Sequence, residues 1–123
     1  MNQVAILWVE PITEVLQDEA EATGDGEVLV LDGKYASLSL QTLGTFTATV
    51  KFEGSMDGEN YHELKGINLN TGAGLSETTS TGVYSVPVVG IKRFRARISA
   101  YTDGEVTVLA SAQAIPVPVV PGP

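Results

Sequence analysis

The feature that most constrains the fold of this chain is a two-residue alternation of apolar and polar side chains, repeated in short runs. Over residues 45–53, four apolar side chains alternate with threonine and lysine. Successive side chains of a β-strand point to opposite faces of its sheet, so this alternation predicts a strand with one buried face. The other runs that predict strands are 27–31, 35–40, 83–89, 93–100 and 105–112.

Turn signals that contain glycine separate these runs. Dipeptides such as Asp-Gly favour tight turns because glycine adopts positive φ angles without steric cost. Short strands broken by such turns are typical of an antiparallel β-sandwich or jelly roll, so the chain is predicted to be all-β. We place this jelly-roll-like sandwich domain at residues 27–114. The turn signals stand at 25–26, 32–33, 43–44, 57–58 and 103–104.

Two segments of the predicted sandwich share one pattern. Tyr35–Ser55 and Arg93–Ala112 each contain a strand, a short turn with glycine and a second strand. We expect two equivalent hairpins that face each other or share a sheet. With 123 residues, the chain has room for a single hydrophobic core of ordinary size.

Acidic residues are concentrated near the N-terminus. The formal net charge is -8, and no lysine or arginine precedes Lys34. Residues 1–26 are therefore predicted as an acidic N-terminal arm, which either contains a short helix beginning near Pro11 or is an ordered arm that meets a partner. An acidic surface repels phosphate, so no nucleic-acid partner is expected. The candidate assembly contacts in this arm are Trp8, Pro11 and Ile12.

The last nine residues, 115–123, alternate proline with valine and form a predicted C-terminal tail. Proline has no N–H to donate, so this segment cannot be a regular helix or a central strand. It is expected to be extended, with little conformational entropy left to lose, and to dock against a neighbouring subunit. Its candidate assembly contacts are Ile115, Pro116, Val117, Pro118, Val119 and Val120.

One basic cluster alternates with apolar residues. On a strand, Arg93, Arg95 and Arg97 share one face, and Phe94 and Ala96 lie on the other. We interpret the arginines as a solvated or interface-facing sheet surface. The alternative interpretation is a basic groove for nucleic acid or acidic sugar.

Residues suited to catalysis or to metal binding are few. The chain contains no cysteine, and its single histidine, His62, has no second histidine with which to hold a metal. The run 57–60 is interpreted as a turn because it lacks the ligands of a calcium-binding loop. No catalytic residue, metal or cofactor is predicted. No run approaches the ~20 apolar residues that span a bilayer, so no membrane partner is expected.

Three runs of the chain resemble a module that is common in virion proteins of tailed bacteriophages. They are GKYASLSLQTLGTFTATVKFEGSMDGENY at 33–61, GVYSVPVVG at 82–90 and FRARISAYTDGEVTV at 94–108. The resemblance covers roughly residues 27–113 and implies a small β-sandwich protein on a phage head, neck or tail. The acidic arm and the Pro-Val tail depart from that module.

This resemblance and the physical pattern lead to one expectation of function. We expect a non-enzymatic virion protein, a capsid decoration or head and neck accessory protein, that forms a homo-oligomer. A trimer is favoured, with the major capsid protein and other virion proteins as further partners. The alternative is a carbohydrate- or receptor-binding module of a tail or fibre, and a hydrolase is a third interpretation. The aromatic residues that would stack on a glycan are Trp8, Tyr35, Tyr61, Tyr84 and Tyr101.

Overall fold

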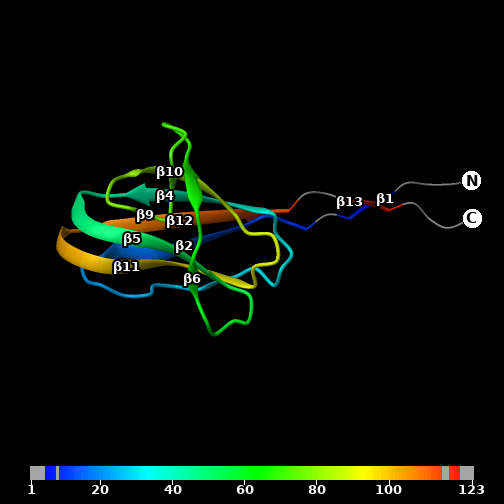
Figure 1. The fold of residues 1–123 in the computed structure, drawn as a ribbon, viewed down its shortest axis with the longest axis horizontal. Helices are drawn as coiled ribbons and strands as arrows, with labels where there is room; N and C mark the ends of the chain where they lie inside the picture. The colour runs from blue at the N-terminus through cyan, green and yellow to red at the C-terminus, as the bar shows by residue number, and fades with distance from the viewer. Residues whose placement is uncertain (1–4, 8, 115–116, 120–123) are drawn as a thin grey trace, which may run out of the picture.

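A computed structural model describes residues 5–7, 9–114 and 117–119 of the chain. Over these residues every named element is a β-strand, and two antiparallel sheets pack face to face as a sandwich (Figure 1). The all-β sandwich predicted from the alternation is therefore confirmed. The described residues contain no helix that could span a membrane.

The larger sheet has six strands, in the order β2-β12-β4-β10-β7-β8. All of its pairings are antiparallel. The strands are β2 (Ile12–Ala20), β4 (Ser37–Leu43), β7 (Gly66–Asn68), β8 (Gly74–Leu75), β10 (Gly82–Pro87) and β12 (Val106–Gln113).

The smaller sheet has five strands, four of them in the order β3-β11-β5-β6, with β9 paired to β5. A strand from near each end of the chain pairs with the other to form a separate two-stranded ribbon. The strands of the sheet are β3 (Leu29–Val30), β5 (Phe46–Ser55), β6 (His62–Glu63), β9 (Glu77–Thr78) and β11 (Arg93–Gly104), and those of the ribbon are β1 (Ala5–Leu7) and β13 (Val117–Val119).

The two segments that share a sequence pattern are not hairpins, so that prediction is wrong. β4 pairs with β12, and β5 pairs with β11. In each segment the chain instead crosses from one sheet to the other at its glycine turn, and the two crossings lie against each other. The segments share both sheets because each strand finds its partner in the other segment.

Glycine makes these two crossings fit. Gly44 and Gly104 have φ angles of 107° and 90°, which favour glycine, and a Cβ on either would overlap the backbone of the opposite crossing. The amide of Glu105 donates to the carbonyl of Thr45 at 3.1 Å and ties the crossings together. Local turn chemistry therefore determines where the chain changes sheet.

The core contains the apolar side of each alternating run. Along β5, Ala48, Val50 and Phe52 are buried, and along β12 all four predicted inward residues are buried. The rings of Phe52 and Tyr84 pack with centroids 5.4 Å apart. Full burial of one such side chain stabilises the fold by roughly 1.5–3 kcal/mol, so this core holds the two sheets together.

β2 corrects the prediction for the N-terminal segment. The helix considered near Pro11 is wrong, because residues 12–20 form an edge strand of the six-stranded sheet. Leu16 and Gln17 are both buried, and the Gln17 amide donates to the carbonyl of Ala96 at 2.8 Å, so β2 is tied to the opposite sheet. The sandwich thus includes residues assigned to an arm. Register shifts in the β2–β12 pairing break the alternation, which is why the strand escaped notice.

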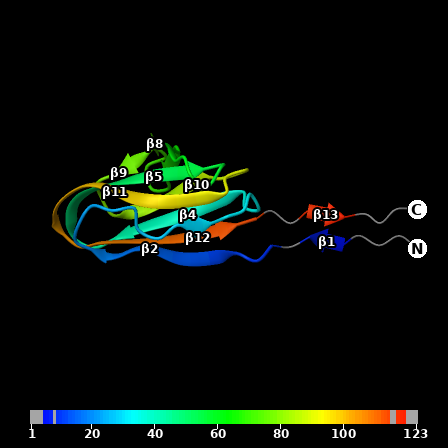
Figure 2. The ribbon, with the colours of Figure 1, turned by 90° about the horizontal axis from the view of Figure 1, so that it is seen from below.

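The ribbon of β1 and β13 extends away from one end of the sandwich (Figure 2). Ala5 lies opposite Val119, and Leu7 lies opposite Val117. Among the described residues, neither strand pairs with a strand of the two larger sheets. The two ends of the chain therefore leave the sandwich together.

Candidate functional site

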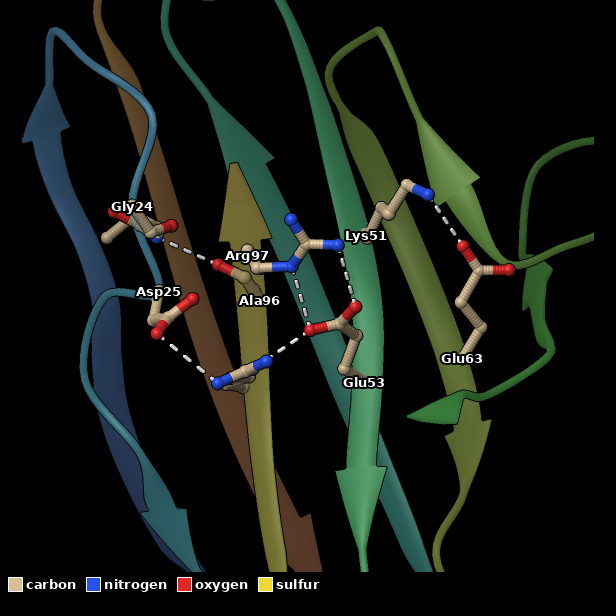
Figure 3. Close-up of polar contacts among 9 residues, drawn as sticks. Gly24, Asp25, Lys51, Glu53, Glu63, Ala96 and Arg97 are labelled. Atoms are coloured by element: carbon tan, nitrogen blue, oxygen red, sulfur yellow. Dashed lines mark hydrogen bonds and ion pairs between the residues drawn. The ribbon is translucent and has the colours of Figure 1, made fainter. Parts of the chain in front are cut away.

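A buried carboxylate organises the outer face of the five-stranded sheet (Figure 3). Glu53 on β5 accepts hydrogen bonds from Nε of Arg95 at 2.9 Å and from Nε and Nη2 of Arg97 at 3.0 and 3.1 Å. Only 7% of its side chain is exposed. The pairing of β5 with β11 places Glu53 directly opposite Arg95. One acid therefore holds two arginines that the alternation placed on one face.

The arginines shift the ionisation of this carboxyl group. Burial alone raises the pKa of Glu53, but the hydrogen bonds from Arg97 and Arg95 outweigh burial and hold the pKa below its ordinary value. Glu53 is therefore charged in the folded protein at neutral pH.

Two further side chains extend this network. Nη1 of Arg95 lies 3.3 Å from Oδ2 of Asp25. The guanidinium of Arg95 also stacks on Tyr61, 4.0 Å from the centre of the ring. Lys51 pairs with Glu63 at 2.8 Å on the same sheet. Lys51, Arg95 and Arg97 are thus paired with acids within the chain. We refer to Asp25, Glu53, Tyr61, Arg95 and Arg97 as the ionic face.

The predicted basic face is changed by these pairings. Arg95 and Arg97 lie side by side as expected, but Glu53 and Asp25 neutralise them. Arg93 is exposed at the start of β11. The arrangement favours the interpretation as a sheet surface over that of a basic groove.

A hollow of about 360 Å³ lies at the end of β5 beside the ionic face. Gly54, Leu64 and Ile91 are among its lining residues, and His62 stands exposed at its rim. Asp57 closes the adjoining turn by accepting from the amides of Glu59 and Asn60, both at 2.8 Å. These and other hydrogen bonds lower the pKa of Asp57. The 57–60 run is thus a turn, as predicted.

The outer face of the six-stranded sheet has the opposite character. β4, β7, β8, β10 and β12 contain no aspartate, glutamate, lysine or arginine. Its outward side chains are mostly serine, threonine and aliphatic residues, and a groove of about 250 Å³ runs between Ser39, Val83 and Leu109. We refer to this surface as the uncharged face.

Acidic side chains gather at the end of the sandwich where β11 turns into β12. Repulsion from Glu19, together with a hydrogen bond to Glu21, raises the pKa of Glu105. Over the described part of the chain, no group of three histidine, cysteine or acidic side chains is placed to hold a metal. The acidic side chains at this end therefore repel one another, and within the described residues they are not arranged as metal ligands.

The tyrosines considered for glycan stacking lie apart from one another. Tyr84 is fully buried with its hydroxyl 2.6 Å from that of Thr78, and Tyr35 is buried as well. Tyr61 is covered by Arg95, and the Tyr101 hydroxyl donates to the carbonyl of Gly104 at 2.7 Å. In the part of the chain that is described, these rings form no exposed platform.

The predicted assembly contacts lie near the ribbon end. Pro11 is exposed, and half-buried Ile12 begins β2. Val117, Pro118 and Val119 form β13, so the tail is extended as predicted over these residues. Trp8, Ile115, Pro116 and Val120 lie outside the described residues.

Sequence reasoning missed Glu53, Asp25 and the stacking of Tyr61. Glu53 is the acid that interrupts the outward threonines and lysine of β5, which was the one available signal. The sequence alone does not show that Glu53 binds the arginines, because that follows only from the pairing of β5 with β11.

Comparison with known proteins supports the fold. The family model XepA matches residues 10–112. The crystal structure of the SPBc2 prophage-derived protein YomS has a TM-score of 0.75 and 22% identity, covering 84% of this chain and 92% of that one. The crystal structure of the PBSX exported protein XepA has a TM-score of 0.79 and 24% identity, and the match covers 84% of this chain and 37% of XepA. No curated protein sequence matches the chain.

Proposed function

The chain belongs to the XepA family, and from this premise we propose that it is a non-enzymatic structural component of a tailed-phage particle. Within the particle we propose the role of a capsid decoration or head and neck accessory protein. Such a protein stabilises the particle by mass action, because it binds the assembled form and not the separate parts. The prophage origin of YomS, which shares the fold, supports a phage role.

The observation that carries this proposal is the ribbon of β1 and β13. Both ends of the chain leave the sandwich together and pair with each other, away from the core (Figures 1 and 2). Their sequences, Ala-Ile-Leu and Val-Pro-Val, are wholly apolar. An isolated two-stranded ribbon is marginally stable in water, so a neighbouring subunit is the natural cover for it. We propose a trimer as the assembled form, with the major capsid protein as a further partner.

The first test is the mass of the purified chain in solution, measured by light scattering. The full chain is compared with a chain that ends at Ala114, which lacks β13, and with a control that ends at Val119 and keeps it. We expect trimers for the full chain and the control, and monomers for the chain that ends at Ala114. A full chain that is monomeric, or a trimer that survives removal of β13, contradicts assembly through the ribbon.

The second test concerns the particle. Purified particles of the phage that encodes the chain are washed in high salt and analysed by quantitative mass spectrometry. We expect the chain to stay with the particles at a fixed copy number. Recovery only from the medium would contradict a virion role and would favour secretion, the property named for the exported XepA protein.

A further inference from the structure

The two strands of the ribbon differ at their outer edges. Ile6 on β1 lies opposite Pro118 on β13. In an antiparallel ladder, opposite residues alternate between pairs that exchange two hydrogen bonds and pairs that exchange none. Proline has no N–H, so this pair is of the second kind, and both residues direct their backbone groups outward. The outer edge of β13 therefore offers only a carbonyl at Pro118, whereas that of β1 offers both an N–H and a carbonyl at Ile6.

The sequence strengthens this difference between the two strands. Pro116, like Pro118, has no N–H to donate. Residues 1–9, by contrast, contain neither a proline nor a charged side chain. Proline and charge are the usual means by which proteins prevent further pairing at a sheet edge. The β13 edge of the ribbon is thus closed to another strand, and the β1 edge is open.

The edge strands of the two sandwich sheets are protected in other ways. β3, β6 and β8 are only two residues long. Along β2, register shifts interrupt the pairing, and Glu14 lies opposite buried Ala110, which puts a charge on the core side of the strand. The amide of Glu27 also donates to the carbonyl of Leu16 at 2.9 Å and covers part of this edge. Short strands, bulges and inward charges all disfavour pairing, so β1 differs from each of these edge strands.

A second copy of β1 fits the open edge. If the two strands run antiparallel about a two-fold axis at Ile6, the N–H of each Ile6 donates to the carbonyl of the other. The product is a four-stranded sheet in the order β13-β1-β1-β13, and proline closes both of its outer edges. Pairing therefore stops at two ribbons. A single strand from another protein would instead need its own protection at the new edge.

Charge also favours this antiparallel arrangement. Each ribbon extends away from its own sandwich, so antiparallel pairing places the two sandwiches at opposite ends of the new sheet (Figure 2). Glu10, the first acidic residue, is four residues from Ile6 in each copy. At about 3.3 Å for each residue, the two Glu10 backbones are up to about 26 Å apart. Salt screens charges beyond about 8 Å, so the net charge of -8 on each chain opposes the contact only weakly.

We propose that two copies of the chain pair antiparallel through the outer edges of β1, with Ile6 of each copy at the two-fold axis. The inference rests on the ribbon that carries the proposed function, and it names the edge through which ribbons meet. A trimeric ring joined edge to edge would need the closed edge of β13, so a trimer has to use the faces of its ribbons. Pairing at β1 then joins two trimers into a hexamer, as a weaker step because short strands exchange few hydrogen bonds.

The first test is sedimentation velocity of the full chain over a concentration series up to ~1 mM, where we expect its mass to double. Ile6→Pro removes the N–H of the open edge, which the ribbon itself does not use, and should raise the dissociation constant of this doubling at least about tenfold. Ile6→Val keeps the N–H and is the matched control, with a change of less than about threefold. At low concentration both variants should keep the mass of the full chain, which verifies that the ribbon is intact.

Cross-linking tests the register independently of proline. The chain has no cysteine, so one introduced thiol can bond only to its copy. Ile6→Cys places two Cα atoms about 5.5 Å apart across the axis, within the range of a disulfide, whereas Leu7→Cys places them about 8 Å apart, beyond it. Under mild oxidation we expect linked pairs of Ile6→Cys and few of Leu7→Cys on a non-reducing gel.

Three results would each overturn the pairing. They are no doubling of the full chain, equal loss of doubling in Ile6→Pro and Ile6→Val, and equal linking of Ile6→Cys and Leu7→Cys. The copy number on washed particles decides the phage role by itself, so the pairing and the proposed function can fail separately.

Discussion

On the outer face of the five-stranded sheet, Glu53 holds two arginines, and a tyrosine and a second acid complete their contacts. On the outer face of the six-stranded sheet, serine, threonine and aliphatic side chains stand without any charge over five strands. Both faces come from strands with the same two-residue alternation. The difference teaches that a polar outward row can complete its contacts inside the chain or leave them to a partner.

The two faces also differ in what their side chains contribute to the free energy of folding. The ionic face contributes to folding, because its charges are partly removed from water and depend on one another. The five strands of the uncharged face carry no charge, so their outward side chains depend less on one another. Substitutions on the two faces should therefore differ in their effect on the free energy of unfolding.

The largest effect is expected from removing the central charge of the ionic face. Glu53→Gln keeps the shape but leaves Arg95 and Arg97 without their carboxylate. We expect a loss of about 2–3 kcal/mol in the free energy of unfolding, between the ~1 kcal/mol of exposed pairs and the ~3–5 kcal/mol of fully buried ones. Chemical denaturation measures it. Glu59→Gln, in the exposed turn after β5, is the control and should change little.

Lowering the pH should gradually remove the contribution of Glu53 to the free energy of unfolding. The pKa of Glu53 is lower in the folded chain, so its stabilisation is fully present above its ordinary pKa of 4.5 and is lost as the pH falls through the folded value. Glu105, with its raised pKa, acts in the opposite direction. Denaturation of the wild type and Glu53→Gln from pH 7 to 3 should show their difference narrowing below about pH 4.5. A constant difference would contradict this origin.

The reverse substitution on the other face should leave folding almost unchanged. Gln41 is exposed near the centre of the uncharged face, so Gln41→Glu should alter the free energy of unfolding by no more than about 0.5 kcal/mol. Chemical denaturation measures the difference. A large loss of stability would show that the two faces are not as different as we infer.

The smallest effect is expected at the exposed pair of Lys51 and Glu63. Their contact of 2.8 Å is largely open to solvent, with 26% and 44% of the two side chains exposed. Glu63→Gln should lower the melting temperature only slightly, and 0.5 M salt should abolish the difference because screening weakens exposed pairs. A shift that persists in salt would place this pair with the Glu53 network instead.

Much of the fold was predictable from local pattern. Alternation along β5 and β12 correctly separated buried from outward side chains. Along β11 it held from Phe94 to Ile98 and was wrong for Ala100, which is exposed because a register shift follows Ile98. β2 was missed because a register shift places Leu16 and its neighbour Gln17 both in the core, which matches neither a strand nor a helix pattern. The candidate surfaces were less predictable. The sequence pattern placed Arg95 and Arg97 on one face but did not identify Glu53 as the acid that binds both.

The sequence by itself determined that the chain is all-β and which side of most strands faces the core. These properties are local, because each side chain's direction follows from its neighbours along one strand. Only the tertiary structure decided that the similar segments cross between sheets and that Glu53 neutralises the arginines. Glu53 and Arg95 lie 42 residues apart in the sequence, and only the pairing of β5 with β11 brings them together. Strand pairing depends on residues that are far apart in the sequence. It therefore determines which outward side chains find partners within the chain and which are left exposed to solvent.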